Sequence, residues 1–338
     1  MRYYIVTTTK FADECLNYLT YGATQSNWLV NINVADIIFL SQFSYKSQDL
    51  FGPLLVSKGL FYNKSIIYPQ QRYFYRIQFK PIETIKRIEE TDLYLNGIQS
   101  KKIGSYFKLI NLIQQNKHLH CICLTDEEGE GILDTFNKIG FDYNFNVQER
   151  KLNEDLIDTN NKYIWDKNKL DKKHYFSSES DMESYIIVSL KYAQSNVYEN
   201  LNNLLKKYQN NDLQFSKIYN QFIFGNAYPS DVVVLNENNI NVFELKKDKL
   251  TNNNIPQIEK EIKKHLYYSL FSDRINSNKI KRFNFYLIFL KDKDNERFKW
   301  SIFERFNRLC NKINTLRENN FAFVEYSVKD DNLILEEI

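Results

Sequence analysis

The sequence is poor in the residues that cross-link, break or loosen a chain. It has four Cys, five Pro and nine Gly among 338 residues, which excludes a disulfide-stapled small domain, a collagen-like chain and a Gly/Pro-rich low-complexity chain. It also lacks a secretory signal pattern and any apolar run of the roughly 20 residues that a membrane helix needs. We therefore expect a cytoplasmic protein with no membrane segment.

The net charge is small as well. The chain has 45 Lys and Arg against 42 Asp and Glu, which leaves a formal net charge of +3. This small excess permits nucleic-acid binding without requiring it. Apolar residues, by contrast, make up 43% of the chain, and the aromatic share is 15%. At this length, that is enough for two hydrophobic cores.

A polar stretch rich in Lys, Asp and Asn divides the sequence in two. It runs from about residue 146 to 176 and shows little periodicity, as expected of a linker. We therefore predict one domain at 1–145, a linker at 146–176 and a second domain at 177–338.

The most informative stretch of the second domain is 228–246. Two short apolar runs, at 232–235 and 240–245, lie on either side of a polar turn at 236–239. Apolar runs separated by a short polar turn predict a β-hairpin.

Acidic and basic residues stand at one end of this hairpin. Asp231 opens its first strand, and Glu244 and Lys246 lie two apart near the end of its second. The period of a strand places Glu244 and Lys246 on one face and Leu245 on the other. Two converging carboxylates form the hard-oxygen site that Mg²⁺ or Mn²⁺ prefers, with the Leu245 carbonyl as a third candidate ligand. A lysine beside them can hold a phosphate or orient a water.

The pattern Pro229-Ser230-Asp231 followed by Glu244-Leu245-Lys246 resembles the PD-(D/E)xK nuclease signature. The resemblance implies a restriction-endonuclease-like α/β core with a mixed central sheet, in which Asp231 and Glu244 bind the cation. It also implies a glutamine on the helix after the lysine, here Gln257, which would orient the lysine or the attacking water. The alternative is a surface hairpin with an ordinary salt bridge.

Members of that superfamily commonly place a glutamate on the first helix of the domain. Glu179 and Glu183 lie one turn apart on a helix that we expect to begin near Ser178, so either could complete the site. The surrounding pattern resembles the helix opening of NucS-like relatives, which favours Glu179. Alternatively, both are surface acids that complement the helix dipole.

The remaining elements of the second domain follow the core order of that superfamily: helix, three strands, helix, strand. Beyond the first helix and the hairpin, we predict a strand at 215–224, a helix at 255–271, a strand at 282–290, a helix at 300–316 and a strand at 321–328.

The first domain has the pattern of short strands with one early helix. Strands are predicted at 3–7, 35–41, 50–56 and 73–79, and a helix at 11–19. Short strands with few helices predict a small β-barrel, so the first domain is expected to be mainly β.

This order resembles the PUA-like superfamily, especially its YTH, EVE and DCD branches. The matching pieces are Asn27-Trp28, the strand at 35–40 and the segment 50–53, while 103–113 resembles the later segment that completes such barrels. Ala35 stands where those domains usually have a glycine.

The PUA-like resemblance implies a reader that takes one modified or unstacked base into an aromatic cage. Trp28 is the expected cage wall, because base stacking on an aromatic face stabilises such complexes. Ser26 and Asn27 could contact a base edge, and Asp36 could supply an acceptor or instead cap a turn. The alternative for Trp28 is an ordinary core residue.

A zinc site at 118–123 is not expected. In a strand, His118 and His120 would face one side while Cys121 and Cys123 face the other. No second ligand pair with zinc spacing follows.

We therefore expect a metal-dependent endonuclease whose N-terminal domain selects modified bases, as in modification-dependent restriction. Its expected substrate is double-stranded DNA, and cutting both strands would favour a homodimer. Three alternatives stay open: a NucS-like repair nuclease that acts on mismatched or branched DNA, an RNA-directed reader, and a nucleic-acid-binding protein whose nuclease fold is inactive.

Overall fold

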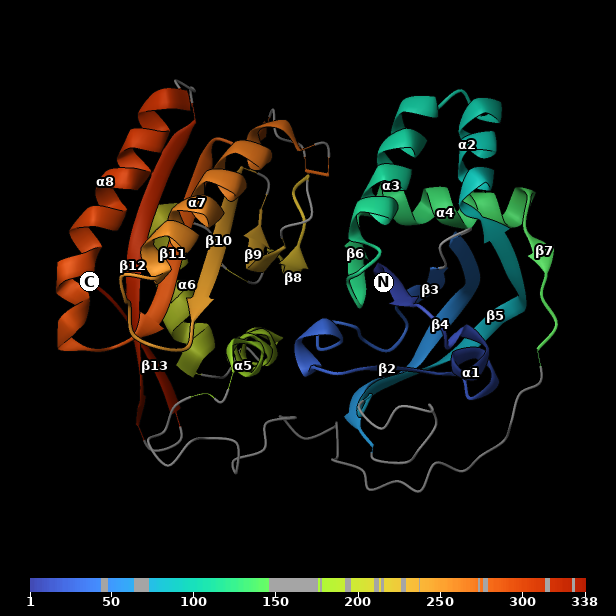
Figure 1. Ribbon diagram of the computed structural model, residues 1–338, viewed down its shortest axis with the longest axis horizontal. Coiled ribbons are helices and arrows are strands. Elements are labelled where there is room, and N and C mark those ends of the chain that lie inside the picture. Colours follow the sequence, from blue (N-terminus) through green and yellow to red (C-terminus); the bar gives the residue numbers. More distant parts are fainter. Residues whose placement is uncertain are drawn as a thin grey trace. The chain divides into compact units, whose positions relative to one another are not determined.

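The computed structural model describes residues 1–43, 48–63, 73–145, 176, 178–191, 196–209, 213, 216–225, 229–236, 238–272, 274–275, 279–313, 317–329 and 332–338. The chain is a two-sheet α/β protein that divides into two compact units, Met1–Ile164 and Trp165–Ile338 (Figure 1). Except for Phe176, the predicted linker at 146–176 lies outside the described residues.

The N-terminal unit contains a seven-stranded mixed sheet. Its strands are β1 (Tyr3–Thr8), β2 (Thr20–Ala23), β3 (Ile37–Phe43), β4 (Gln48–Tyr62), β5 (Tyr75–Glu89), β6 (Cys121–Leu124) and β7 (Phe141–Asp142). The order is β2-β5-β4-β3-β1-β6, with β7 also on β5. β1 is parallel to β3, and the other pairs are antiparallel.

The strands predicted in this unit form, but the sheet is not the small barrel that we expected. In the described residues the sheet path ends at β2 and β6, which do not pair, so the sheet is an open half-barrel. β4 and β5 bend at several register shifts, and such irregularities raise the local twist and curl a sheet.

Helices close the unit where the sequence suggested few. They are α1 (Ala12–Asn17), the 3₁₀ turn η1 (Ser26–Trp28), α2 (Glu90–Gln99), α3 (Ile103–Asn116) and α4 (Asp126–Lys138). The segment 103–113, expected to complete a barrel, is helical and belongs to α3. Gly129 lets α4 approach the sheet closely, because a Cβ there would lie 2.1 Å from the Tyr3 Cγ.

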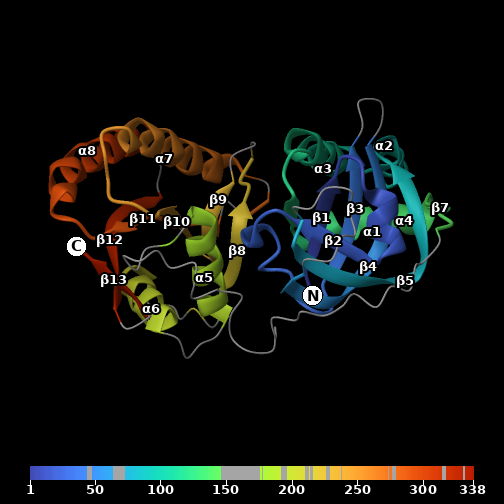
Figure 2. The same cartoon turned by 60° about the horizontal axis from the view of Figure 1, so that its bottom comes forward.

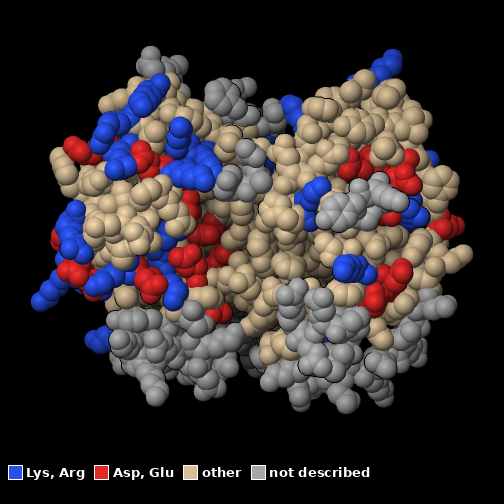
Figure 3. Space-filling model, viewed as in Figure 1, with Lys and Arg blue, Asp and Glu red and all other residues tan. Residues whose placement is uncertain are grey.

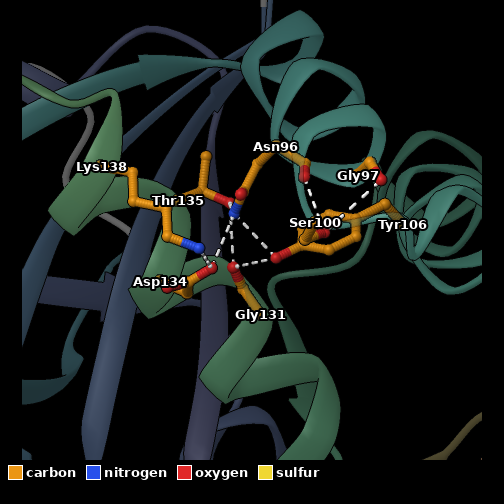
Figure 4. A network of polar contacts seen from close by, with 8 residues as sticks. All are labelled: Asn96, Gly97, Ser100, Tyr106, Gly131, Asp134, Thr135 and Lys138. Atoms are coloured by element: carbon orange, nitrogen blue, oxygen red, sulfur yellow. Dashed lines mark hydrogen bonds and ion pairs between the residues drawn. The ribbon is translucent and has the colours of Figure 1, made fainter.

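A buried polar network joins α2, α3 and α4 (Figure 4). The two N–H groups of Asn96 Nδ2 are shared among three acceptors, Tyr106 Oη at 2.8 Å, Thr135 Oγ1 at 2.8 Å and Asp134 Oδ2 at 3.1 Å. Tyr106 Oη in turn donates to the Gly131 carbonyl at 3.2 Å. Because Asn96 is fully buried, these bonds fix the three helices against one another.

The C-terminal unit is built on a six-stranded mixed sheet of order β13-β12-β11-β10-β9-β8. Its elements are α5 (Glu179–Lys191), α6 (Asn196–Gln209), β8 (Lys217–Phe222), β9 (Ser230–Leu235), β10 (Asn239–Lys246), α7 (Asn254–Phe271), β11 (Arg282–Leu290), η5 (Lys293–Asn295), α8 (Glu296–Ile313), β12 (Glu318–Lys329) and β13 (Asn332–Glu337). α7 and α8 cover one face, and α5 and α6 the other (Figure 2).

The predicted hairpin and the order of elements after it are confirmed. β9 and β10 pair antiparallel, and β10, β11 and β12 run parallel. β13, which the sequence analysis missed, adds an antiparallel edge. The register of the parallel strands is marked by Asn241, Asn284 and Asn320, whose side chains hydrogen-bond in sequence across them at 2.8 and 2.9 Å.

Candidate active site

Asp231 and Glu244 lie beside each other at one end of the β9–β10 pair. The last paired residues are Val232 and Phe243, so the next step of the register places Asp231 opposite Glu244. Asp231 Oδ2 accepts the backbone N–H of Leu245 at 2.9 Å. The carboxylate of Asp231 is therefore turned toward β10, as the hairpin pattern predicted.

Lys246 is the cation of this cluster. Its Nζ donates to Glu244 Oε1 at 2.8 Å, and the two side chains are only 5% and 6% exposed. The same Nζ lies 3.4 Å from Glu261 Oε2 on α7. One ammonium thus stands between two carboxylates that come from different elements.

Gln257 reaches the cluster only through Glu261. Its side chain is exposed, and its Nε2 donates to Glu261 Oε1 at 2.7 Å. No direct contact between Gln257 and Lys246 is seen among the described residues.

His265 closes the other side of Glu244. Its Nε2 lies 3.6 Å from Glu244 Oε2, and its Nδ1 lies 2.9 Å from Ser230 Oγ. All three side chains are buried. Both oxygens of Glu244 therefore face nitrogen atoms, one of Lys246 and one of His265.

Sequence reasoning missed Glu261, His265 and Ser230 as members of the site. The signal was the four-residue spacing of Gln257, Glu261 and His265, which puts them on one face of α7. The buried apolar residues next to them mark that face as the one turned to the sheet: Ile258, Ile262 and Leu266.

The two α5 glutamates lie at different places around the cluster. Glu183 is buried, and its Oε2 accepts from Gln221 Nε2 at 2.7 Å. Its charge also acts on Asp231, whose pKa it raises. Glu179 is exposed, interacts electrostatically with Lys246 and Glu244, and hydrogen-bonds the backbone of Lys247, just after β10. Glu183 is thus the α5 glutamate associated with Asp231.

Gln221 has an unusual backbone. Its φ is +50°, a left-handed conformation that is uncommon for residues other than glycine. It falls between the paired residues Asn220 and Phe222 of β8, both matched to β9. The Gln221 side chain contacts Glu183, and residues with such uncommon backbone conformations are often found at functional sites.

Burial and mutual repulsion set the protonation of the acids. Burial raises the pKa of Asp231, and the charges of Glu244 and Glu183 raise it further. Burial and Glu244 likewise raise the pKa of Glu261 to about 8. For Glu244, burial is outweighed by Lys246 and His265, which lower its pKa to about 2.

Lys246 stays charged in this setting. Burial alone would lower its pKa, but Glu244, Glu261 and Asp231 together raise it well above the usual range. Acidic side chains gather on the C-terminal unit next to α7, with Lys and Arg side chains around them (Figure 3).

The donors present fit a hard divalent cation that also takes water or phosphate ligands. In the part of the chain that the structure describes, no three His, Cys, Asp or Glu side chains converge as a complete metal cage. Mg²⁺, however, is usually held by only one or two carboxylates plus waters and substrate phosphate. Asp231 and Glu244 supply two, and their repulsion, seen in the raised pKa of Asp231, is what a bound cation relieves.

The candidate base-binding residue of the N-terminal unit, Trp28, is half-buried. Its ring centroid lies 5.9 Å from that of His120, which is 6.4 Å from Tyr73, itself 6.0 Å from Phe11. These four half-buried rings, from four separate segments, form an aromatic group. The spacing of these four residues in the sequence does not predict that their rings lie together.

The polar residues predicted beside Trp28 are less available. Ser26 and Asn27 are buried. Asp36 accepts the backbone N–H groups of Arg2 and Asn33, both at 2.8 Å. Asp36 therefore caps a turn, which is the alternative that its position at the start of a strand allowed.

The histidines and cysteines near 120 have other partners. Cys121 and Cys123 are buried in β6, and His118 and His120 precede that strand. His120 Nδ1 lies 3.3 Å from Tyr21 Oη. This places His120 with the aromatic group.

No helix among the described residues is long and apolar enough to cross a membrane. No protein-family model, curated protein or solved structure matches this chain.

Proposed function

We propose that the C-terminal unit is a metal-dependent nuclease with a restriction-endonuclease-like core of the PD-(D/E)xK type. The observation that carries the proposal is the convergence of Asp231, Glu244 and Lys246 at the end of one hairpin, with Glu183 beside them. An ordinary surface salt bridge would not gather these acids around one lysine, because burying excess charge is unfavourable. The expected substrate is the phosphodiester of nucleic acid, with double-stranded DNA as the first choice.

In this proposal, Asp231 and Glu244 hold Mg²⁺ or Mn²⁺, and the Leu245 carbonyl is the candidate third ligand. The bound cation would supply an activated water and offset the negative charge of the phosphate. The acids repel a phosphate that approaches without the ion, so the site selects for cation and substrate together.

The protein's own groups orient the reactants. Lys246 presents its ammonium next to Glu244, where it can hold a phosphate oxygen or a water and offset charge that develops during the reaction. Glu183 completes the acidic wall and is itself held by Gln221. We assign Glu183 this role and give Glu179, which bonds the backbone of Lys247, a place at the outer rim.

We further propose that the N-terminal unit is a PUA-like reader and that its aromatic group stacks on a single unstacked base. Half-buried Trp28 is supported by His120 and Tyr73, an arrangement suited to a planar ligand. Joined to a nuclease, such a reader would make cleavage depend on a modified base.

Cleavage of matched duplexes tests the proposal. The purified chain is incubated with Mg²⁺, Mn²⁺, Ca²⁺ or EDTA and with unmodified, methylated, hydroxymethylated, mismatched and single-stranded DNA. We expect cleavage with Mg²⁺ or Mn²⁺, little with Ca²⁺ and none in EDTA. Full activity in EDTA would remove the metal mechanism, and preference for mismatched DNA would favour a repair nuclease.

A matched pair of variants separates the site from the surface. Asp231→Asn should lose cleavage, whereas Glu304→Gln, which changes an exposed acid paired with Arg308 on α8, should retain it. If Asp231→Asn cleaves as fast as the unaltered protein, the nuclease assignment is wrong.

A further inference from the structure

We infer that Glu261 is a positioning residue that holds Lys246 in place, and that Gln257 in turn holds Glu261. The inference deepens the proposed nuclease function and rests on it. In this assignment, a carboxylate of α7, which also interacts with Glu244, acts on the reaction by holding the lysine of β10.

The contacts form a relay between the two elements. Gln257 Nε2 donates to Glu261 Oε1 at 2.7 Å, and Glu261 Oε2 lies 3.4 Å from Lys246 Nζ. Oε1 of Glu261 is thus hydrogen-bonded within α7, whereas its buried Oε2 has no hydrogen-bond partner among the described residues and lies within ion-pair distance of β10. The hydrogen bond from Gln257 to Oε1 therefore turns Oε2 toward the lysine.

Lys246 needs a second anchor because its first is shared. Glu244 accepts from Lys246 through Oε1 and faces His265 through Oε2, and the proposed cation would draw on the same carboxylate. Lysine is a flexible side chain with substantial rotamer entropy. A second carboxylate from another element holds the ammonium when the first is engaged elsewhere.

Charge balance argues against a purely structural ion pair. One carboxylate already neutralises Lys246, yet a second acid, Glu261, lies beside it with a side chain only 20% exposed, where burial and Glu244 raise its pKa. An extra acid at a buried pair costs free energy. Proteins place such destabilising groups mainly at functional sites.

Three variants test the relay in the full-length protein. Glu261→Leu removes both contacts and keeps much of the volume. Glu261→Gln keeps an acceptor for Lys246, because exposed Gln257 can turn its amide to match. Glu259→Leu is the control, since Glu259 lies two residues away on α7 but pairs with Arg305 of α8.

We expect Glu261→Leu to lower kcat by roughly 10–100-fold, because misplacing a reacting group by about an ångström has an effect of that size. We expect the KM for DNA to change by less than about threefold, because Glu261 does not contact the substrate. Glu261→Gln should recover most of the rate, and Glu259→Leu should keep it. Wild-type kcat in Glu261→Leu would overturn the inference while leaving the nuclease assignment intact.

A second measurement needs neither metal nor DNA. In protein labelled with ¹⁵N-lysine, a buried and doubly anchored ammonium exchanges slowly and gives an ¹H–¹⁵N signal, assigned by its loss in Lys246→Arg. The signal should persist in Glu259→Leu and Glu261→Gln and vanish in Glu261→Leu. If it is unchanged in Glu261→Leu, Glu261 does not hold the lysine. A chain that cleaves no nucleic acid would overturn the nuclease proposal, while this signal would still report on the contact.

Discussion

Asp231 Oδ2 accepts the backbone N–H of Leu245 at 2.9 Å, which ties the acid that opens β9 to the strand that carries Glu244. The bond prevents Asp231 from moving away from Glu244 to relieve their repulsion. The acidic pair is therefore held together by the backbone of the hairpin, and its unfavourable electrostatics are available for a cation to offset.

Removing either acid should abolish cleavage but change stability in opposite directions. Asp231→Asn removes a disfavoured charge and keeps an acceptor for Leu245, so the free energy of unfolding without metal should stay the same or rise. Glu244→Ala leaves Lys246 and His265 without their shared partner, which should cost roughly 3 kcal/mol. Urea unfolding in EDTA measures both. Equal destabilisation by the two variants would contradict this electrostatic account.

Lys246→Ala should lower the cleavage rate by about 10²–10³, the usual effect of removing one preorganised electrostatic group. Binding of DNA in Ca²⁺ should change much less, because a single contact to phosphate is a small part of the total affinity. Single-turnover cleavage and a binding titration on the same preparation distinguish the two effects. Loss of binding in parallel with rate would mean that Lys246 serves substrate affinity.

The protein without metal should lose stability as the pH rises. Burial and Glu244 raise the pKa of Glu261 to about 8 from 4.5, so the folded state keeps a proton that the unfolded chain has released. Stability therefore falls from about pH 5 to about pH 8. Glu244 has the opposite shift, to about 2, and its contribution is lost only as the pH falls below about 4.5.

Thermal unfolding in EDTA between pH 5 and 8 measures this slope. Glu261→Gln cannot titrate and should reduce the slope to the part that Asp231, whose pKa is also raised, contributes, while Glu259→Gln on the same helix should leave the slope unchanged. A slope that is identical in the unaltered protein and in Glu261→Gln would assign the pH dependence to other groups.

Local patterns were predictable from the sequence, and contacts between distant segments were not. The hairpin and the placement of Asp231, Glu244 and Lys246 follow from strand periodicity over fewer than 20 residues. Glu261 and His265 join the site only because α7 packs over β10. This packing between distant segments cannot be predicted from a local sequence pattern. The barrel prediction is confirmed only in part, as a curled half-barrel, because closure depends on how far β4 and β5 curl.

Ala35 stands where the PUA-like domains usually have a glycine, and its backbone conformation makes that difference relevant to stability. Its φ is +70°, a left-handed conformation that glycine adopts readily and other residues adopt at a cost of about 1–2 kcal/mol. Ala35→Gly should therefore stabilise the N-terminal unit by about 0.5–1 kcal/mol after the entropy of glycine is subtracted. Ala12→Gly, inside helix α1, is the opposite control and should destabilise by about 1 kcal/mol or more.

The half-buried position of Trp28 makes the reader proposal testable with one substitution. A Trp that serves only as a core residue would cost roughly 3–5 kcal/mol of stability when truncated to Ala. A cage wall would instead lower the affinity for the preferred substrate by roughly 1–3 kcal/mol, the contribution of stacking on one base. Because Trp28 is only half-buried and lies against the half-buried ring of His120, we expect the loss of affinity to dominate.

Thermal unfolding and a DNA titration on Trp28→Ala separate these contributions, and Trp28→Phe should restore most of the binding through its ring face. Trp300→Ala is the control, because Trp300 on α8 is 69% exposed and lies in the C-terminal unit. It tests whether losing any exposed indole weakens DNA binding. A Trp28→Ala protein that is unstable, but whose folded fraction binds modified DNA normally, would refute the cage. A stable Trp28→Ala protein that no longer distinguishes modified from plain duplex would support dependence of cleavage on a modified base, because only the reader would have changed.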